Sequence, residues 1–169
     1  MKKLKLGVSS CLLGESVRYN GEHKRDSTVI DLLGQQFEAV PVCPEVELGM
    51  GVPREPVRLV ANDASSERMV GSESGKDWTQ AMADFNSIKL EALRQQNLSG
   101  FIFKSRSPSC GPGNVPLHHE QEKSSTVGLF AHALMQYFPS LPVIDEEALQ
   151  DEIVRQDFVA RVIQYGEKV

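Results

Sequence analysis

Apolar residues follow two different periods along the 169-residue chain, and each period predicts one kind of element. Short runs rich in β-branched and aromatic residues predict strands at 3–10, 37–43, 57–61, 100–104 and 141–145. Segments with an apolar residue every three or four positions predict helices at 27–34, 78–92, 126–138 and 149–165. We expect the apolar stripes of these helices to face the core.

Polar residues, glycines and prolines mark the expected helix ends. Ser27 is a candidate N-cap of the first helix, Gly34 is its stop, and Asp77 is a candidate N-cap of the second helix. Pro139 ends the third helix, and Gly166 lies just past the end of the fourth. The clearest core stripes are Trp78, Met82, Phe85, Ile88 and Ala92, and Leu149, Ile153, Phe158, Val162 and Tyr165.

Strands that alternate with helices are typical of an α/β fold with a mostly parallel sheet covered by helices on both faces, a Rossmann-like arrangement. A length of 169 residues predicts a single domain, residues 1–169. The strand at 57–61 follows Pro53 and Pro56 and is expected at a sheet edge or in a loop. Ligands of such sheets bind beyond the carboxyl ends of the strands.

Composition narrows the possible partners. A net charge of −5 argues against nucleic acid as the main partner, and no apolar run is long enough to span a membrane. The basic start, MKKLKLGVSS, is too short and too interrupted for a signal peptide, so we expect a cytoplasmic protein. The odd number of cysteines, three, argues against a disulfide framework.

Each cysteine lies where a predicted strand ends. Cys11 follows the first strand, Cys43 closes the second, and Cys110 lies in the loop KSRSPSCGPGN after the strand GFIF. Because the carboxyl ends of parallel strands meet at one edge, the three thiols are predicted to point into one crevice. Glycine or proline follows each cysteine closely, which lets the backbone approach a bulky group.

Three thiolates in one crevice need a positive charge, because like charges raise each other's pKa. A zinc ion with three thiolates and a water would supply it, and so would a [4Fe–4S] cluster with three cysteine ligands and one open iron. Both alternatives stay open on the residues alone. The four histidines lie outside the cysteine loops and are interpreted as solvated or structural residues; they are His23, His118, His119 and His132.

Carboxylates and hydroxyls follow the same strands. Glu45 is the candidate general base, whereas Glu47 is interpreted as a solvated loop charge. Ser105, Ser107 and Ser109 alternate, which in an extended segment would put their hydroxyls on one side; any one of them could instead form a turn, the more common use of a loop serine. Basic residues that could offset the thiolates or hold a substrate, most of them interpreted as surface charges, are Arg18, Arg54, Arg58, Lys104 and Arg106.

Three segments, GVSSCLLGESVRYNG, VCPEVELGMGVPREPVRL and KSRSPSCG, together closely resemble the thiouracil desulfurase family. The resemblance runs through all three cysteine segments and covers nearly the whole chain. It implies an enzyme that holds a [4Fe–4S] cluster through Cys11, Cys43 and Cys110, with one iron free to bind the sulfur of a thiolated nucleobase such as 2-thiouracil.

The resemblance also implies roles in proton transfer. Glu45 would be the acid/base carboxylate, and Ser107 would assist it, with Ser105 and Ser109 as alternatives. The expected partner is a small thiolated base; its physiological identity and the oligomeric state stay open. Two rival functions are an iron–sulfur sulfur transferase acting on tRNA or another acceptor, and a non-catalytic sensor of metal or oxygen that uses the same thiols.

Overall fold

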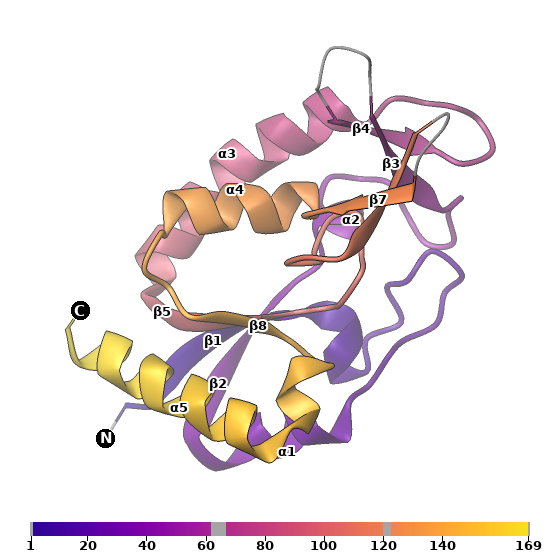
Figure 1. Ribbon diagram of the computed structural model, residues 1–169. Coiled ribbons are helices and arrows are strands. Elements are labelled where there is room, and N and C mark those ends of the chain that lie inside the picture. Colours follow the sequence, from indigo (N-terminus) through magenta and orange to yellow (C-terminus); the bar gives the residue numbers. More distant parts are fainter. Residues whose placement is uncertain (1, 62–66, 120–122, 169) are drawn as a thin grey trace.

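A four-stranded sheet forms the centre of the fold (Figure 1). The computed structural model describes residues 2–61, 67–119 and 123–168. Every neighbouring pair of strands in this sheet is parallel. In spatial order the strands are β2 (Phe37–Val42), β1 (Leu4–Ser9), β5 (Leu98–Phe103) and β8 (Val143–Asp145).

Helices cover both faces of this sheet (Figure 1). One face carries α1 and α5 and the other carries α3 and α4, with the bounds Ser27–Gln36, Glu152–Glu167, Thr79–Gln96 and Leu129–Tyr137. Successive side chains of a strand point to opposite faces, so Phe101 and Phe103 of β5 join the core under α3 and α4, whereas Ile102 joins the core under α1 and α5. The predicted α/β class is confirmed.

A second sheet was not predicted. Its strands, in spatial order, are β4 (Glu67–Gly71), β3 (Val57–Ala61), β6 (Val115–His118) and β7 (Lys123–Thr126). β3 pairs antiparallel with β4 and parallel with β6, so the expectation of an edge or loop position for 57–61 is wrong. This sheet lies beyond the carboxyl ends of β1, β2 and β5 (Figure 1).

The predicted helix ends shift by up to four residues. Asp26, not Ser27, caps α1, because its Oδ1 accepts from the Val29 amide at 3.0 Å. α1 continues through Gly34 to Gln36, so the prediction that Gly34 ends the helix is wrong. Asp77 lies one residue before the cap of α3, although its carboxylate accepts from the Thr79 amide at 2.9 Å.

The predicted stripe of α3 is correct only in its first half. Met82 is buried, but Ile88 is 75% exposed. Ile88 lies six residues after Met82, which places it about 120° away around a helix of 3.6 residues per turn. The core face continues instead through Asn86, Leu90 and Leu93.

The last predicted helix is in fact two elements. A 3₁₀ turn, η2 (Ala148–Gln150), precedes α5, which breaks the phase of the predicted stripe. Leu149 is therefore buried while Ile153 is 79% exposed. Gly166 lies inside α5, so its predicted place just past the end of the helix is wrong. None of the helices described is long and apolar enough to cross a membrane.

Candidate functional site

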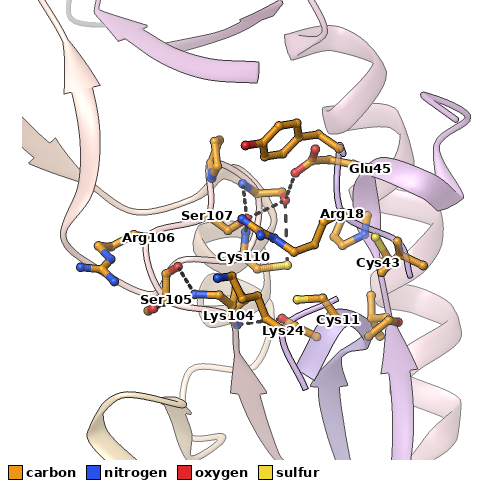
Figure 2. A pocket seen from close by; sticks show the side chains of 18 of the residues that line it. Cys11, Arg18, Lys24, Cys43, Glu45, Lys104, Ser105, Arg106, Ser107 and Cys110 are labelled. Carbon is orange, nitrogen blue, oxygen red and sulfur yellow. Dashed lines mark hydrogen bonds between the residues drawn. The ribbon is translucent and has the colours of Figure 1, made fainter. Parts of the chain in front are cut away.

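The three cysteines, far apart in sequence, line one cavity of about 670 Å³ (Figure 2). β1 leads into the 3₁₀ turn η1 (Ser10–Leu13), which carries Cys11. β2 leads into the short helix α2 (Pro44–Glu47), for which Cys43 is the N-cap. Cys110 lies in the turn after β5. The structure therefore brings the predicted thiols together at the carboxyl edge of the parallel sheet.

Strand order explains why the cavity forms there. β1 and β5 are neighbours at the centre, and the chain leaves β1 toward β2 on one side and β5 toward β8 on the other. Connections that diverge in this way leave a crevice beyond the strand ends. Cys11 and Cys110 sit on the two sides of that divergence.

The thiols resist ionisation as they stand. Burial raises the pKa of Cys11 to about 11, and it also raises the pKa of Cys43 and of Cys110. The charge of Cys43 raises the pKa of both other thiols further, as expected for neighbours. Within residues 2–61, 67–119 and 123–168, no three cysteine, histidine or carboxylate side chains converge closely enough to hold a single metal ion.

The Cys110 turn is fastened to the start of α4. The amides of Phe130 and Ala131 both donate to the Ser109 carbonyl at 3.0 Å, and the Gly128 amide donates to the Gly111 carbonyl at 2.8 Å. These are N-terminal amides without partners inside the helix, so the turn and the helix satisfy each other. The Cys110 turn is therefore held by backbone hydrogen bonds to a separate helix as well as by its own sequence.

Gly128→Ala is expected to destabilise this turn. A Cβ at Gly128 would lie 2.7 Å from the carbonyl carbon and oxygen of Ser109, and backbone atoms cannot rotate away. We expect a loss of about 1–3 kcal/mol in the free energy of unfolding, measured by chemical denaturation. Gly34→Ala is the matched control, because nothing lies within 4 Å of its added Cβ. An equal loss in both variants would contradict this interpretation.

Glu45 points into the cavity from the first turn of α2 (Figure 2). Its Oε1 accepts from Arg54 Nε at 3.1 Å, and its Oε2 accepts from Ser109 Oγ at 2.8 Å. The Glu45 and Arg54 side chains are only 13% and 8% exposed. A buried carboxylate held through both oxygens has a fixed orientation toward whatever occupies the cavity.

Glu47 lies outside the lining of the cavity. It is not the solvated loop charge that was expected, because its Oε2 accepts from the Cys43 amide at 2.9 Å and its Oε1 accepts from Lys89 Nζ at 2.6 Å. Glu47 therefore fixes the backbone of Cys43 from outside the cavity, whereas Glu45 faces the cavity.

The serines all line the cavity, but the expected extended segment is a series of turns in which Arg106 has φ of 58°. Ser105 Oγ donates to the Glu146 carboxylate, another part of the cavity wall, at 2.7 Å. Ser107 Oγ accepts from the Cys110 amide at 3.1 Å and lies 3.1 Å from Ser109 Oγ. Of the three serines, Ser109 is the one that contacts Glu45 directly. Ser107, which the sequence favoured, is hydrogen-bonded to Ser109 and is therefore one step further from the carboxylate.

Basic residues surround the cavity in spite of the negative net charge. Of those predicted, Arg58 is exposed and does not line it. The four histidines are exposed and do not line it either, in agreement with their interpretation. Sequence reasoning missed Glu146, although it follows a parallel strand just as the cysteines do. The basic residues of the lining are Arg18, Lys24, Arg25, Arg54, Lys104 and Arg106.

Comparisons with known proteins identify the family of this chain. Residues 6–146 match the family described as 2-thiouracil desulfurase. The solved structure of a [4Fe–4S]-dependent thiouracil desulfidase, TudS, is similar with a TM-score of 0.67 and 30% sequence identity, covering 88% of this chain and 94% of that one. The uncharacterized protein YbbK of Bacillus subtilis (strain 168) is 34% identical over 112 residues, which are 64% of this chain and 74% of that protein. The chain therefore belongs to the 2-thiouracil desulfurase family.

Proposed function

We propose that this protein is an enzyme that removes sulfur from a thiolated nucleobase such as 2-thiouracil. Three thiols and one buried carboxylate that face a single cavity, in a chain of this family, carry the proposal. The reaction balances as C=S plus water giving C=O, hydrosulfide and a proton. No electron is gained or lost.

The donor set fits a [4Fe–4S] cluster held by Cys11, Cys43 and Cys110. Thiolates are the protein ligands that such clusters prefer, and the thiols line a cavity rather than meeting at a point. Lys104 and Arg18 lower the pKa of Cys11, so basic side chains assist its ionisation. Held by these three cysteines, a cluster would supply an open, Lewis-acidic iron for the sulfur of the C=S group.

Glu45, held in place by Arg54, carries out the transfer of the proton that the attacking water releases. Glu45 takes a proton from the water that attacks the carbon of the C=S group, because it lines the cavity and is held there by Ser109 of the Cys110 turn. Arg54 holds one oxygen of Glu45, which keeps the carboxylate in place through the reaction. The same proton is then available for the departing sulfur.

Ser109 passes protons to and from Glu45, and Ser107 extends the chain. Ser109 Oγ donates to Glu45, which leaves its lone pairs free to accept the hydroxyl proton of Ser107 at 3.1 Å. Ser107 Oγ is itself oriented by the amides of Ser109 and Cys110. The path Ser107–Ser109–Glu45 replaces the single assisting serine expected from the sequence.

Anaerobic reconstitution with iron and sulfide, followed by incubation with 2-thiouracil, tests the proposal. We expect catalytic release of hydrosulfide with formation of uracil, and no release from uracil alone. If a cluster assembles but no sulfide is released from any thiolated pyrimidine or purine, the proposed substrate class is wrong. Strong, salt-dependent binding of tRNA would favour a sulfur transferase instead.

A further inference from the structure

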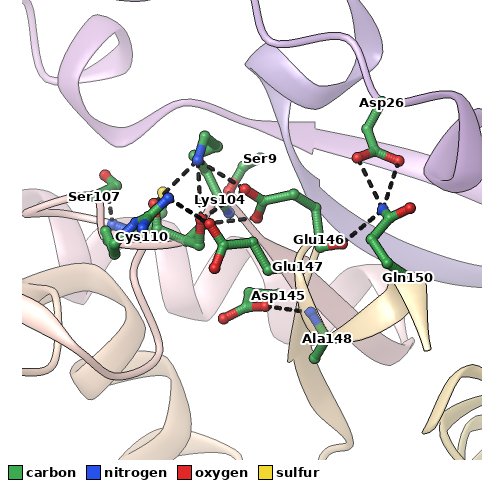
Figure 3. A network of polar contacts seen from close by, with 12 residues as sticks. Ser9, Asp26, Lys104, Ser107, Cys110, Asp145, Glu146, Glu147, Ala148 and Gln150 are labelled. Carbon is green, nitrogen blue, oxygen red and sulfur yellow. Dashed lines mark hydrogen bonds and ion pairs between the residues drawn. The ribbon is translucent and has the colours of Figure 1, made fainter.

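Lys104 and Glu146 form a buried ion pair in the cavity wall (Figure 3). Phe103 of β5 pairs with Asp145 of β8, so the next residue of each strand, Lys104 and Glu146, emerges at the same level. Lys104 Nζ lies 2.7 Å from Glu146 Oε1, and the side chains are 18% and 10% exposed. The desulfurase mechanism given above leaves Glu146 without a role.

Every proton of the Lys104 ammonium has a partner. Besides Glu146, Lys104 Nζ donates to the Ser105 hydroxyl at 3.0 Å and to the Ser105 carbonyl at 3.2 Å. Glu146 in turn accepts from the hydroxyl and the amide of Ser105, each at 2.7 Å. Lys104 is therefore a fixed positive charge and not a free proton donor.

A buried ion pair is a poor source of stability, because desolvation of both charges offsets their attraction. Its position suggests another use. Lys104 has the largest effect of any charge on the pKa of Cys11, which it lowers, while Glu146 raises the same pKa and has the smallest effect named. Figure 3 shows Lys104 between Cys110 and Glu146, so the positive end of the pair lies toward the cysteines and the negative end lies on the far side.

We propose that Lys104 stabilises the hydrosulfide anion that desulfuration leaves in the cavity, and that Glu146 weakens this attraction so that the anion can leave. This inference rests on the proposed function. Cleavage of a neutral thiolated base adds one anion to a site that already holds three thiolates. A fixed ammonium nearby offsets that charge, and its carboxylate partner prevents the product from being held too tightly. Lys104 and Glu146 thus act in opposite directions.

The test measures affinity for sodium hydrosulfide, added anaerobically at constant pH to the cluster-loaded protein and followed by visible absorption. Lys104→Met is expected to weaken hydrosulfide binding by about tenfold, and Glu146→Gln to strengthen it by severalfold. The midpoint potential of the cluster, measured without any substrate, is expected to fall in Lys104→Met and to rise in Glu146→Gln. Lys104→Arg keeps the positive charge, so its hydrosulfide affinity and midpoint potential should lie closer to the wild-type values than those of Lys104→Met.

Glu147→Gln is the matched control. Glu147 is the next residue and also contacts Ser105, but it pairs with Arg106 at the surface, where its side chain is 53% exposed and water screens its charge. Hydrosulfide affinity and potential should stay at the wild-type values in this variant.

If hydrosulfide affinity and potential shift in opposite directions in Lys104→Met and Glu146→Gln, the inference is supported. Shifts of the same sign, or no shift, overturn it. A merely structural pair would weaken hydrosulfide binding in both variants. Should Lys104→Met fail to assemble a cluster, Lys104→Gln replaces it, and Glu146→Gln alone can contradict the inference. A wild-type protein that binds hydrosulfide but does not act on 2-thiouracil refutes the proposed function and not the pair's electrostatic role; one that binds no hydrosulfide refutes the pair's role.

Discussion

Cys110→Ser is expected to abolish both iron binding and sulfide release from 2-thiouracil. A serine hydroxyl stays protonated near neutral pH and is a hard ligand, so it does not replace a thiolate toward iron–sulfur iron. Only Cys11 and Cys43 would then remain to hold the cluster. After anaerobic reconstitution, iron and acid-labile sulfide per chain should fall to background, and the visible absorption of the cluster should be absent.

The same outcome is expected for Cys11→Ser and Cys43→Ser, since one cluster needs all three ligands. Cys110 is 5% exposed, so a change in folding has to be separated from a loss of ligation. Thermal unfolding of the metal-free variants provides that control and should match metal-free wild type within a few degrees. Wild-type iron content in any one of the three variants would contradict a shared cluster.

Glu45→Gln is expected to leave the cluster in place and to lower kcat by about 10²–10⁴-fold, the range for loss of a positioned acid/base group. Glutamine has the same size; its amide oxygen can still accept from Arg54, and its NH2 group can donate to Ser109 Oγ, so the geometry of the wall is preserved. It cannot take a proton from water. Sulfide release at saturating 2-thiouracil measures kcat, and iron content with visible absorption measures the cluster.

Glu47→Gln is the matched control for this variant. Glu47 lies on the same helix but outside the cavity lining, and an amide oxygen can still accept from the Cys43 amide. We expect it to change kcat far less than Glu45→Gln. Similar losses in the two variants would remove Glu45 from its proposed role, and unchanged turnover in Glu45→Gln would favour a site in which the carboxylate does no proton transfer.

The parallel sheet was predictable because strand–helix alternation is a local property of the chain. Runs such as Phe37–Val42 and Leu98–Phe103 are apolar enough to be identified singly. The second sheet was not predictable in the same way. β7 reads KSST, which has no apolar pattern, and becomes a strand because it pairs with β6 from Val115 to His118. Pairing between segments is a tertiary property.

The site likewise contains features that the sequence predicted and features that depend on tertiary contacts. Convergence of Cys11, Cys43 and Cys110 on one cavity followed from their places after parallel strands, since topology brings strand ends together whatever their separation in sequence. The choice among the serines did not follow, because the turn around Arg106 breaks the alternation on which the expectation depended. The residues that follow this turn, Pro108 and Ser109, are held by amides at the start of α4, some twenty residues further along the chain.

By itself the sequence determined the α/β class, the three thiols and the candidate carboxylate Glu45, because each depends on residue type and on position relative to a strand. Only the tertiary structure decided that Ser109 touches Glu45, that Glu47 supports Cys43 from outside, and that Lys104 pairs with Glu146 across two strand ends. These contacts depend on directions of side chains and on distances of a few ångströms between separate segments. A linear pattern contains no information at that scale.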